Sequence, residues 1–212
     1  MNVLIVGSGS LPDENMVKRY HQWADLVIAA DGGQMHLKRF GFKSDVLLGD
    51  FDSIDCAELA EIKAQSVSEL ITFPREKDYT DLELAINAAI ERGATNIVLL
   101  GATGTRLDHT TANIHLLHKF IEHNIEGYIE DKYNRIYLVN KSLTIKKQDG
   151  YKVSILPLPP YAGGVTTKGL TYALSDAKLT FGTGLGISNE FCDETATISL
   201  KEGLILVFLS RD

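Results

Sequence analysis

The chain has 212 residues, of which 28 are acidic and 21 basic, so its formal net charge is −7. This length allows one large domain or two small ones and is sufficient to bury a core. The negative charge argues against nucleic acid or an anionic membrane as the main partner. A bound phosphate would therefore need local help from a metal ion, an arginine or a helix N-terminus.

The first ten residues, MNVLIVGSGS, predict a strand that runs into glycines rather than a signal peptide. No apolar run approaches the length that crosses a bilayer. Cys56 and Cys192 stand without a CxxC pattern or a ligand-spaced histidine, which indicates two reduced thiols. We therefore expect a cytoplasmic protein.

Up to about residue 125 the pattern predicts strands and helices in alternation. The expected strands are apolar runs that end at turn residues, at 3–6, 26–30, 46–48, 70–73 and 96–100. The expected helices lie between or after them, at 14–23, 34–40, 57–65, 81–92 and 110–123. This alternation is typical of an α/β fold with a mainly parallel, doubly wound sheet.

Near residue 127 the pattern changes to short runs of β-branched residues between turns. These runs lie at 128–130, 135–139, 143–145, 151–156, 164–168, 170–174, 195–200 and 204–209. With no convincing helix among them, they predict an antiparallel β-sandwich or barrel. We place an α/β domain at residues 1–130 and a β-sandwich domain at 131–212.

The stretch VLLGDFDS at residues 46–53 ends an apolar run in two carboxylates, Asp50 and Asp52. At the carboxyl edge of a sheet they would repel each other, and a hard cation such as Mg²⁺ would relieve that repulsion and bridge to substrate phosphates. An ordinary turn is the alternative, because aspartate hydrogen-bonds its own backbone. Asp31 follows the preceding strand in the same way and leaves both interpretations open.

The turn at residues 7–9, Gly-Ser-Gly, follows the first strand but lacks the third glycine of a GxGxxG fingerprint. As evidence for a dinucleotide fold it is weak. A tight turn beside bound phosphates remains plausible, because glycines let backbone N–H groups approach an anion.

Charged residues at 75–81 precede the strongest predicted helix. Thr80 and Glu83 fit a capping box, and the dipole at the helix start is a sufficient structural reason for Asp78 and Asp81. Lys77 would suit a nucleotide phosphate as well as an ion pair.

The loop GATGTRLDH at residues 101–109 combines glycines, Arg106 and Asp108 ahead of the next predicted helix. It offers backbone donors, a forked cation and a carboxylate, although it is not a Walker A sequence. A plain helix N-cap is the alternative role for Asp108. Among the histidines, His109 has the strongest claim to a function.

The stretch at residues 182–191 is too rich in glycine to serve for core packing. Ser188 and Asn189 supply donors and acceptors that suit the polar edge of a heterocycle. A flexible hairpin tip is the alternative.

Taken in order, five motifs resemble the thiamine pyrophosphokinase (thiamine diphosphokinase) family, and the resemblance spans nearly the whole chain. They are ADGG at 30–33, GDFDS at 49–53, KDYTD at 77–81, TRLDH at 105–109 and GISNEF at 186–191. The resemblance implies an α/β nucleotide-binding catalytic domain and a β-sandwich domain for thiamine binding and dimerisation. It also implies a homodimer that transfers the diphosphoryl group of ATP to the thiamine hydroxyl and releases AMP.

The resemblance also implies roles for individual residues. Mg²⁺ would be held by Asp50, Asp52 and Asp81. The implied catalytic residues are all charged: Asp50, Asp52, Asp78, Asp81, Arg106 and Asp108. The implied substrate-binding residues are Asp31, Lys77, Thr80, Thr105, His109, Ser188, Asn189 and Phe191. Among these, Ser188 and Asn189 would meet the aminopyrimidine across the dimer interface, and Phe191 is a candidate for the aromatic residue that packs on thiamine.

Two alternatives remain open from the sequence. One is a diphosphokinase of the same fold that acts on another alcohol, such as a hydroxymethylpterin. The other is a non-catalytic protein that binds thiamine or a nucleotide. Within the enzyme hypothesis, Asp108 or Asp78 could accept the hydroxyl proton, although a loose transition state needs little help from a base.

Overall fold

The computed structural model describes residues 1–11, 13–50, 67–74 and 78–212. It divides the chain into two compact units, Met1–Lys132 and Tyr133–Asp212. The fold class expected from the sequence is confirmed, with a parallel α/β sheet in the first unit and antiparallel sheets in the second. The roles that the sequence suggests for the two parts stay predictions.

The sheet of the first unit is parallel and has the strand order β4-β3-β2-β1-β5-β6. Its strands are β1 (Asn2–Val6), β2 (Leu26–Ala30), β3 (Ser44–Gly49), β4 (Val67–Thr72), β5 (Asn96–Leu100) and β6 (Glu126–Glu130). The strands β1, β2 and β5 are buried at four successive positions, as expected of strands that are covered on both faces.

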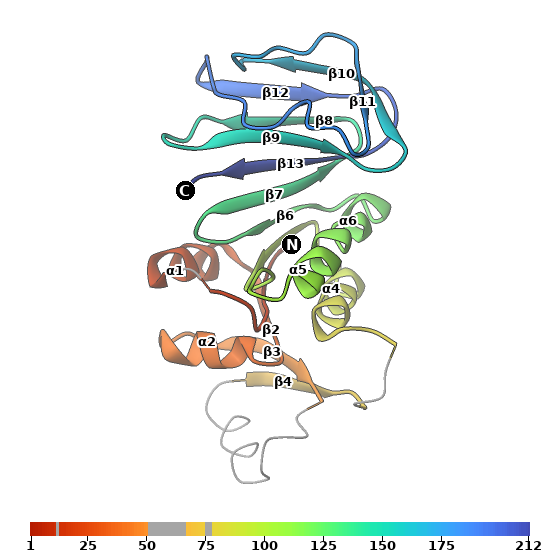
Figure 1. Cartoon of the computed structure of the whole chain (residues 1–212). Coiled ribbons are helices and arrows are strands. Elements are labelled where there is room, and N and C mark those ends of the chain that lie inside the picture. The colour runs from red at the N-terminus through yellow and green to blue at the C-terminus, as the bar shows by residue number, and fades with distance from the viewer. Residues whose placement is uncertain (12, 51–66, 75–77) are drawn as a thin grey trace. The chain divides into compact units, whose positions relative to one another are not determined.

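Helices cover both faces of this sheet. They are α1 (Glu14–Trp23), α2 (Gly33–Arg39), α4 (Asp81–Glu91), α5 (Leu107–His115) and α6 (His118–Glu122). Leu4 and Val6 share one core cluster with Val17 of α1 and Leu37 of α2. In Figure 1, α1 and α2 lie on one side of the sheet and α4, α5 and α6 on the other. The arrangement is the doubly wound one that the alternating pattern predicts.

The helix expected at 110–123 differs from the structure. It begins earlier, at Leu107, and it is two helices, because α5 ends at His115 and α6 begins at His118. Arg106 occupies the N-cap position of α5, so Asp108 lies in the first helical turn and the N-cap interpretation of Asp108 is wrong. The helix expected at 57–65 lies outside the described residues, as does Cys56.

The second unit consists of two antiparallel sheets, with the orders β7-β13-β9 and β11-β10-β12-β8. The strands are β7 (Asn134–Val139), β8 (Ser142–Lys146), β9 (Lys152–Pro157), β10 (Tyr161–Lys168), β11 (Ala177–Thr180), β12 (Thr195–Ser199) and β13 (Ile205–Ser210). One core cluster takes side chains from both sheets, among them Ile155, Val165, Ile198 and Val207. The unit is therefore a β-sandwich.

Two strand predictions failed in the second unit. Residues 170–174 form no strand, although Leu170 makes an isolated bridge to Phe191. The strand β11 was not predicted, because it buries only Leu179 and a single buried position gives no alternating pattern.

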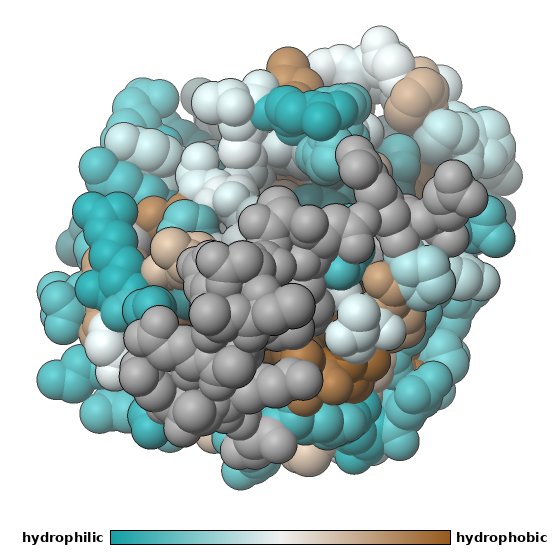
Figure 2. All heavy atoms as spheres, turned by 90° about the horizontal axis from the view of Figure 1, so that it is seen from below, coloured by the Kyte–Doolittle hydropathy of each residue, from teal (hydrophilic) through white to brown (hydrophobic). Residues whose placement is uncertain are grey.

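Apart from the three gaps at 12, 51–66 and 75–77, the chain contains no helix that is both long and apolar enough to cross a membrane. Among the residues that carry a hydropathy colour in Figure 2, hydrophilic ones predominate and the hydrophobic ones lie in small groups.

Candidate active site

The first unit has a topological switch point between β1 and β5. From β1 the chain adds β2, β3 and β4 toward one edge of the sheet, and β5 then lies on the opposite side of β1. Ligands of open α/β sheets bind beyond the carboxyl ends of the strands at such a point. The loops that begin at Gly7 and Gly101 leave β1 and β5 at this place.

These two loops pack backbone against backbone. The N–H groups of Gly7, Gly9 and Ser10 donate to the carbonyl oxygens of Leu100, Gly101 and Thr103, at 2.8, 2.8 and 2.6 Å. A β carbon at position 9 would lie 2.3 Å from the Thr103 oxygen, so glycine is required for this approach. The N–H groups of Gly7 and Gly9 are therefore already bound by the neighbouring loop, and the interpretation of this turn as one that lies beside bound phosphates stays a prediction.

A cavity of about 480 Å³ opens at the switch point. Its walls come from residues 7–9, 30–31, 80–82 and 101–113, so loops that are far apart in the sequence meet around it. The volume falls within the usual range of small-molecule sites. This cavity is the candidate active site of the first unit.

Some of the predicted site residues meet at this cavity and others do not. Those that line it are Asp31, Thr80, Asp81, Thr105, Arg106 and His109. The other predicted residues that the structure describes in the first unit, Asp50, Asp78 and Asp108, are not among the lining residues. Asp52 and Lys77 lie outside the described residues. Ser188, Asn189 and Phe191 belong to the second unit.

Asp31 and Asp50 follow two neighbouring parallel strands. The N–H of Asp31 donates to the carbonyl oxygen of Leu48 at 2.8 Å, which joins the ends of β2 and β3. Asp31 has a left-handed backbone conformation with φ of 49°, which aspartate tolerates better than most residues. Asp31 therefore forms a turn and also lines the cavity, and its role in substrate binding stays a prediction.

Helix α4 begins at the cavity with half of the predicted capping box. The Thr80 hydroxyl accepts a hydrogen bond from the N–H of Glu83 at 3.2 Å. The Glu83 carboxylate instead forms an ion pair with Lys119 of α6, at 3.2 Å. Thr80 thus has a structural role, and it places Asp81 in the first turn of the helix, beside the cavity.

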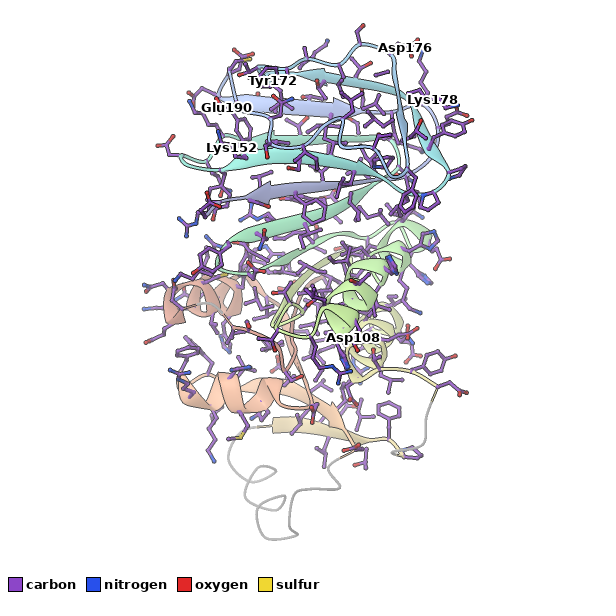
Figure 3. The ribbon with its side chains drawn as sticks, in the orientation of Figure 1. Asp108, Lys152, Tyr172, Asp176, Lys178 and Glu190 are labelled. Carbon is purple, nitrogen blue, oxygen red and sulfur yellow. The ribbon has the colours of Figure 1, made fainter. Side chains whose placement is uncertain are left out.

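Arg106 and Asp108 form a forked ion pair at the start of α5, where Figure 3 labels Asp108. Arg106 Nη2 lies 2.6 Å from Asp108 Oδ2, and Nε lies 3.3 Å from Oδ1. This hydrogen bonding, with a contribution from the His109 backbone, lowers the pKa of Asp108 to about 2. A carboxylate with so low a pKa is a weak base, so Asp108 is better suited to orienting Arg106 than to accepting a proton.

Two further lining residues were missed in the sequence. Thr110 Oγ1 accepts from the N–H of Gly104 at 3.1 Å, and Asn113 Nδ2 donates to the carbonyl of Ala102 at 2.7 Å. They bind the loop after β5 to helix α5. Their spacing of three residues, which places both on one helix face, is the signal that could have identified them. Similarly, His36 donates from Nε2 to the Gly9 carbonyl at 2.9 Å and supports the first loop.

The sequence predicts that Mg²⁺ is held by oxygen ligands alone, the carboxylates of Asp50, Asp52 and Asp81. Within the described ranges, no group of three or more His, Cys, Asp or Glu side chains is placed to hold a metal ion. Mg²⁺ commonly takes one or two carboxylates and completes its coordination with water and substrate phosphates. The donor chemistry of Asp50 and Asp81 therefore fits Mg²⁺, with the third predicted ligand, Asp52, outside the described residues.

A parallel α/β unit with a polar cavity at its switch point, followed by an antiparallel β-sandwich, defines a two-domain α/β enzyme with a small-molecule site at the sheet edge. Residues 17–129 match the family model for the thiamin pyrophosphokinase catalytic domain, and residues 141–205 match the model for its vitamin B1 binding domain. The chain belongs to the thiamine pyrophosphokinase family, as its five motifs predicted.

Individual relatives agree with this assignment. The thiamine pyrophosphokinase of Bacillus subtilis is 33% identical over 189 residues, which cover 88% of each chain. Thiamine pyrophosphokinase 1 of rice is 28% identical and covers 89% of this chain and 73% of its own. A crystal structure of the Bacillus subtilis thiamine pyrophosphokinase superposes over the full length of both chains with a TM-score of 0.87 and 31% identity. The family is one of kinase-type diphosphotransferases, so neither the pterin enzyme nor the non-catalytic alternative is favoured.

Proposed function

We propose that the cavity of the first unit binds ATP and that the protein transfers the diphosphoryl group of ATP to the thiamine hydroxyl, giving thiamine diphosphate and AMP. The observation that carries this assignment of the site is the convergence of Asp31, Asp81 and Arg106 on one cavity at the switch point. Family membership supplies the reaction. The cavity supplies charged groups where a triphosphate needs them.

Residues of the chain itself provide much of the phosphate recognition. Arg106 lines the cavity with a planar, forked cation, and Asp108 holds one side of that fork. At the start of α5 the N-cap residue Arg106 makes no side-chain capping hydrogen bond, and the N–H of His109 in the first turn is bound by the Asp108 carboxylate. The guanidinium of Arg106 would therefore be the main group that stabilises the charge that spreads over the phosphoryl oxygens during transfer.

Mg²⁺ is the proposed cofactor, with Asp50, Asp52 and Asp81 as its proposed ligands. This assignment is supported by two carboxylates, that of Asp50, which directly follows β3, and that of Asp81, which begins α4. When bound, the ion would neutralise charge on the phosphates and orient them. The carboxylates would then serve chiefly to position the ion and, through it, the nucleotide.

Thiamine is proposed to bind the second unit, whose residues match a vitamin B1 binding domain. We also propose a homodimer with the thiamine site at the subunit interface. Exposed apolar side chains in the glycine-rich loop, Leu185 and Ile187, support an interface there. A cytoplasmic location stays a prediction from the sequence.

The decisive measurement is the nucleotide product. Purified protein with ATP, MgCl₂ and thiamine should release AMP and thiamine diphosphate in equal amounts, and release of ADP would refute diphosphoryl transfer. A hydroxymethylpterin in place of thiamine should give no AMP above background. Removal of Mg²⁺ with EDTA should stop turnover, and added Mg²⁺ should restore it.

Variants test the assignment of the cavity. Asp81→Asn should lower kcat by about 100-fold, because a charged group at the transferring phosphates is lost. Asp149→Asn, in an exposed turn of the second unit, is the matched control and should keep wild-type turnover. Equal rates for Asp81→Asn and the wild type would exclude Asp81 from the site.

A further inference from the structure

Asp131 lies at the carboxyl edge of the parallel sheet, at the end of the strand beside β5. It directly follows β6, whose residues pair in parallel with those of β5 as far as Leu99 and Ile129. Its Oδ2 accepts a hydrogen bond from the hydroxyl of Thr103 at 2.8 Å. Thr103 belongs to the loop that leaves β5. A carboxylate at the end of one strand therefore holds the loop that follows the neighbouring strand.

The strand end that carries Asp131 is itself anchored. Glu130, the last residue of β6, is buried and accepts hydrogen bonds from Tyr20 and Arg19 of α1. On its other side, β6 is joined to β5 by the sheet. The backbone that presents Asp131 is therefore held by both a helix and a strand.

Thr103 is the residue at which three segments meet. Its hydroxyl binds Asp131, and its carbonyl oxygen accepts the N–H of Ser10, in the loop after β1, at 2.6 Å. The next residue, Gly104, exchanges two hydrogen bonds with the hydroxyl of Thr110 on α5, at 3.1 and 3.3 Å. The path of the loop is thus set from several sides just before it reaches Arg106.

Neither side of this contact reaches the candidate active site directly. In the part of the chain that the structure describes, the cavity is lined by residues 101–102 and 104–106 on both sides of Thr103, but not by Thr103 or Asp131. Both residues are half-buried. Their hydrogen bond can therefore act on a ligand only through the loop that it holds.

We propose that Asp131 is a positioning residue for ATP, which holds the loop at residues 101–106 through the Thr103 hydroxyl so that Arg106 reaches the phosphates. The inference rests on the proposed function, because it takes ATP as the ligand of the cavity. A loop that already has its binding conformation loses less conformational freedom when the nucleotide binds. The role needs an acceptor oxygen at Asp131 rather than a negative charge.

Asp25 provides a matched control at the opposite edge of the sheet. It directly precedes β2, and its Oδ2 accepts from the N–H of Asn2, the first residue of β1, at 2.8 Å. This carboxylate also joins the ends of two neighbouring strands. Its contact lies at the amino ends of the strands, whereas the cavity lies at their carboxyl ends.

The first test compares alanine at these two positions. Asp131→Ala should raise the KM for ATP about tenfold, because Arg106 is no longer held in place, and should leave the KM for thiamine at saturating ATP within about twofold. Asp25→Ala should keep both constants within about twofold of the wild type. An unchanged KM for ATP in Asp131→Ala, or equal increases in the two variants, would overturn the proposal.

Two substitutions of similar size test the Thr103 hydroxyl. Thr103→Val removes the donor and should raise the KM for ATP as much as Asp131→Ala does, whereas Thr103→Ser keeps the hydroxyl and should retain most of the wild-type affinity. Because the two side chains act as a pair, Asp131→Ala should add less than about twofold to Thr103→Val. Effects that multiply in the double variant would show that Asp131 does not act through Thr103.

Two more comparisons separate positioning from a direct charge effect. Asp131→Asn keeps an acceptor oxygen and should raise the KM for ATP less than Asp131→Ala does. In the Arg106→Ala background, Asp131→Ala should raise it by less than about twofold. An asparagine variant as impaired as the alanine variant, or the same tenfold factor without Arg106, would overturn the positioning role.

Calorimetric titration with MgATP in the absence of thiamine separates this inference from the proposed function. If the wild type binds MgATP but releases no AMP with thiamine, the proposed function fails, and weaker binding to Asp131→Ala still supports the role of Asp131. If AMP forms normally and Asp131→Ala binds MgATP as the wild type does, only the inference fails. Absence of MgATP binding by the wild type would overturn both.

Thermal unfolding checks that each variant is folded at the assay temperature. If Asp131→Ala is not folded, Thr103→Val, which nearly keeps the volume of the side chain, replaces it in the comparison with Asp25→Ala. A KM for ATP that is unchanged in a folded Thr103→Val would then overturn the proposal.

Discussion

Gly101 of the first unit and Gly184 of the second have opposite surroundings. In the first unit, a β carbon at Gly101 would lie 2.3 Å from the Gly7 oxygen, so glycine lets two loops pack against each other. In the second unit, no described atom lies within 4 Å of the corresponding position at Gly184. The same residue type therefore marks close backbone packing in one region and an open turn in the other, and the sequence alone does not distinguish them.

Two charged clusters, one in each unit, also differ in burial. In the first unit, Glu130 is only 6% exposed and accepts hydrogen bonds from Tyr20 and from Arg19, the latter at 2.9 Å. In the second unit, the Lys152–Glu190 ion pair is about half-exposed on both sides. Because the Glu130 carboxylate is buried, the loss of a hydrogen-bond partner is costly there, whereas an exposed pair is screened by water.

The largest expected effect tests the comparison of the glycines. Gly101→Ala should lower the free energy of unfolding by about 3 kcal/mol or more, because position 101 has φ of 64° and faces the Gly7 oxygen. Gly184→Ala should change it by less than about 0.5 kcal/mol. Urea denaturation of both variants measures the difference, and similar midpoints would contradict the comparison.

The next effect concerns Arg106 and Asp108, an exposed pair beside the cavity. Arg106→Ala should lower kcat/KM for ATP by about 100-fold, because a cation at the phosphates is lost. Asp108→Asn should lower kcat/KM for ATP less, by about tenfold, because the Arg106 guanidinium is still present but is less firmly oriented. When Arg106 has already been replaced by alanine, Asp108→Asn should lower kcat/KM for ATP by less than twofold. Arg92→Ala, which breaks the pair with Glu69 at the C-terminal end of α4, is the control with wild-type turnover.

A pH profile sharpens this prediction. Because the pKa of Asp108 is about 2, the carboxylate stays ionised from pH 5 to pH 9. The ratio of wild-type to Asp108→Asn activity should therefore be constant over that range. A ratio that changes with pH would indicate that Asp108 itself moves a proton. An equal cost of Asp108→Asn with and without Arg106 would show that Asp108 does not act by orienting Arg106.

The smallest effects concern the buried and exposed charges. Tyr20→Phe removes a hydrogen bond to buried Glu130 and should lower the free energy of unfolding by about 1–2 kcal/mol. Glu190→Gln breaks the exposed pair and should cost about 0.5 kcal/mol. Chemical denaturation measures both changes. If the two variants lose the same free energy of unfolding, burial does not explain a difference in stability between the two clusters.

Tyr20 also predicts a pH dependence. Burial, reinforced by Glu130, raises the pKa of Tyr20 well above its ordinary value near 10. Above pH 10 the unfolded chain therefore releases the phenolic proton while the folded chain keeps it, so the free energy of unfolding falls as pH rises. Urea titrations from pH 8 to pH 11 should show this fall in the wild type and a smaller one in Tyr20→Phe.

Much of the site was accessible from the sequence. Asp31, Asp81, Arg106 and His109 each follow a predicted strand or begin a predicted helix, and in a parallel α/β sheet those positions share one edge. The roles of Thr110 and Asn113 were not predicted. Both side chains hydrogen-bond to the backbone of the loop after β5, and such side-chain-to-backbone contacts leave no characteristic sequence pattern in the loop. The N-cap of this helix was placed two residues too late, at Asp108, because the residue that occupies it, Arg106, is not one of the usual capping residues.

The order of strands and helices, the five motifs and the family follow from the sequence itself, because apolar periodicity and turn residues are local properties. The tertiary structure decided which polar groups already have a hydrogen-bond partner within the protein. The N–H of Gly9 is bound by a carbonyl 92 residues away in the chain, at Gly101, and Asn189 is bound by Tyr172. Such pairings depend on how distant segments meet, so only the folded chain shows that Gly9 supports a loop and that the Asn189 carboxamide binds the backbone of Tyr172.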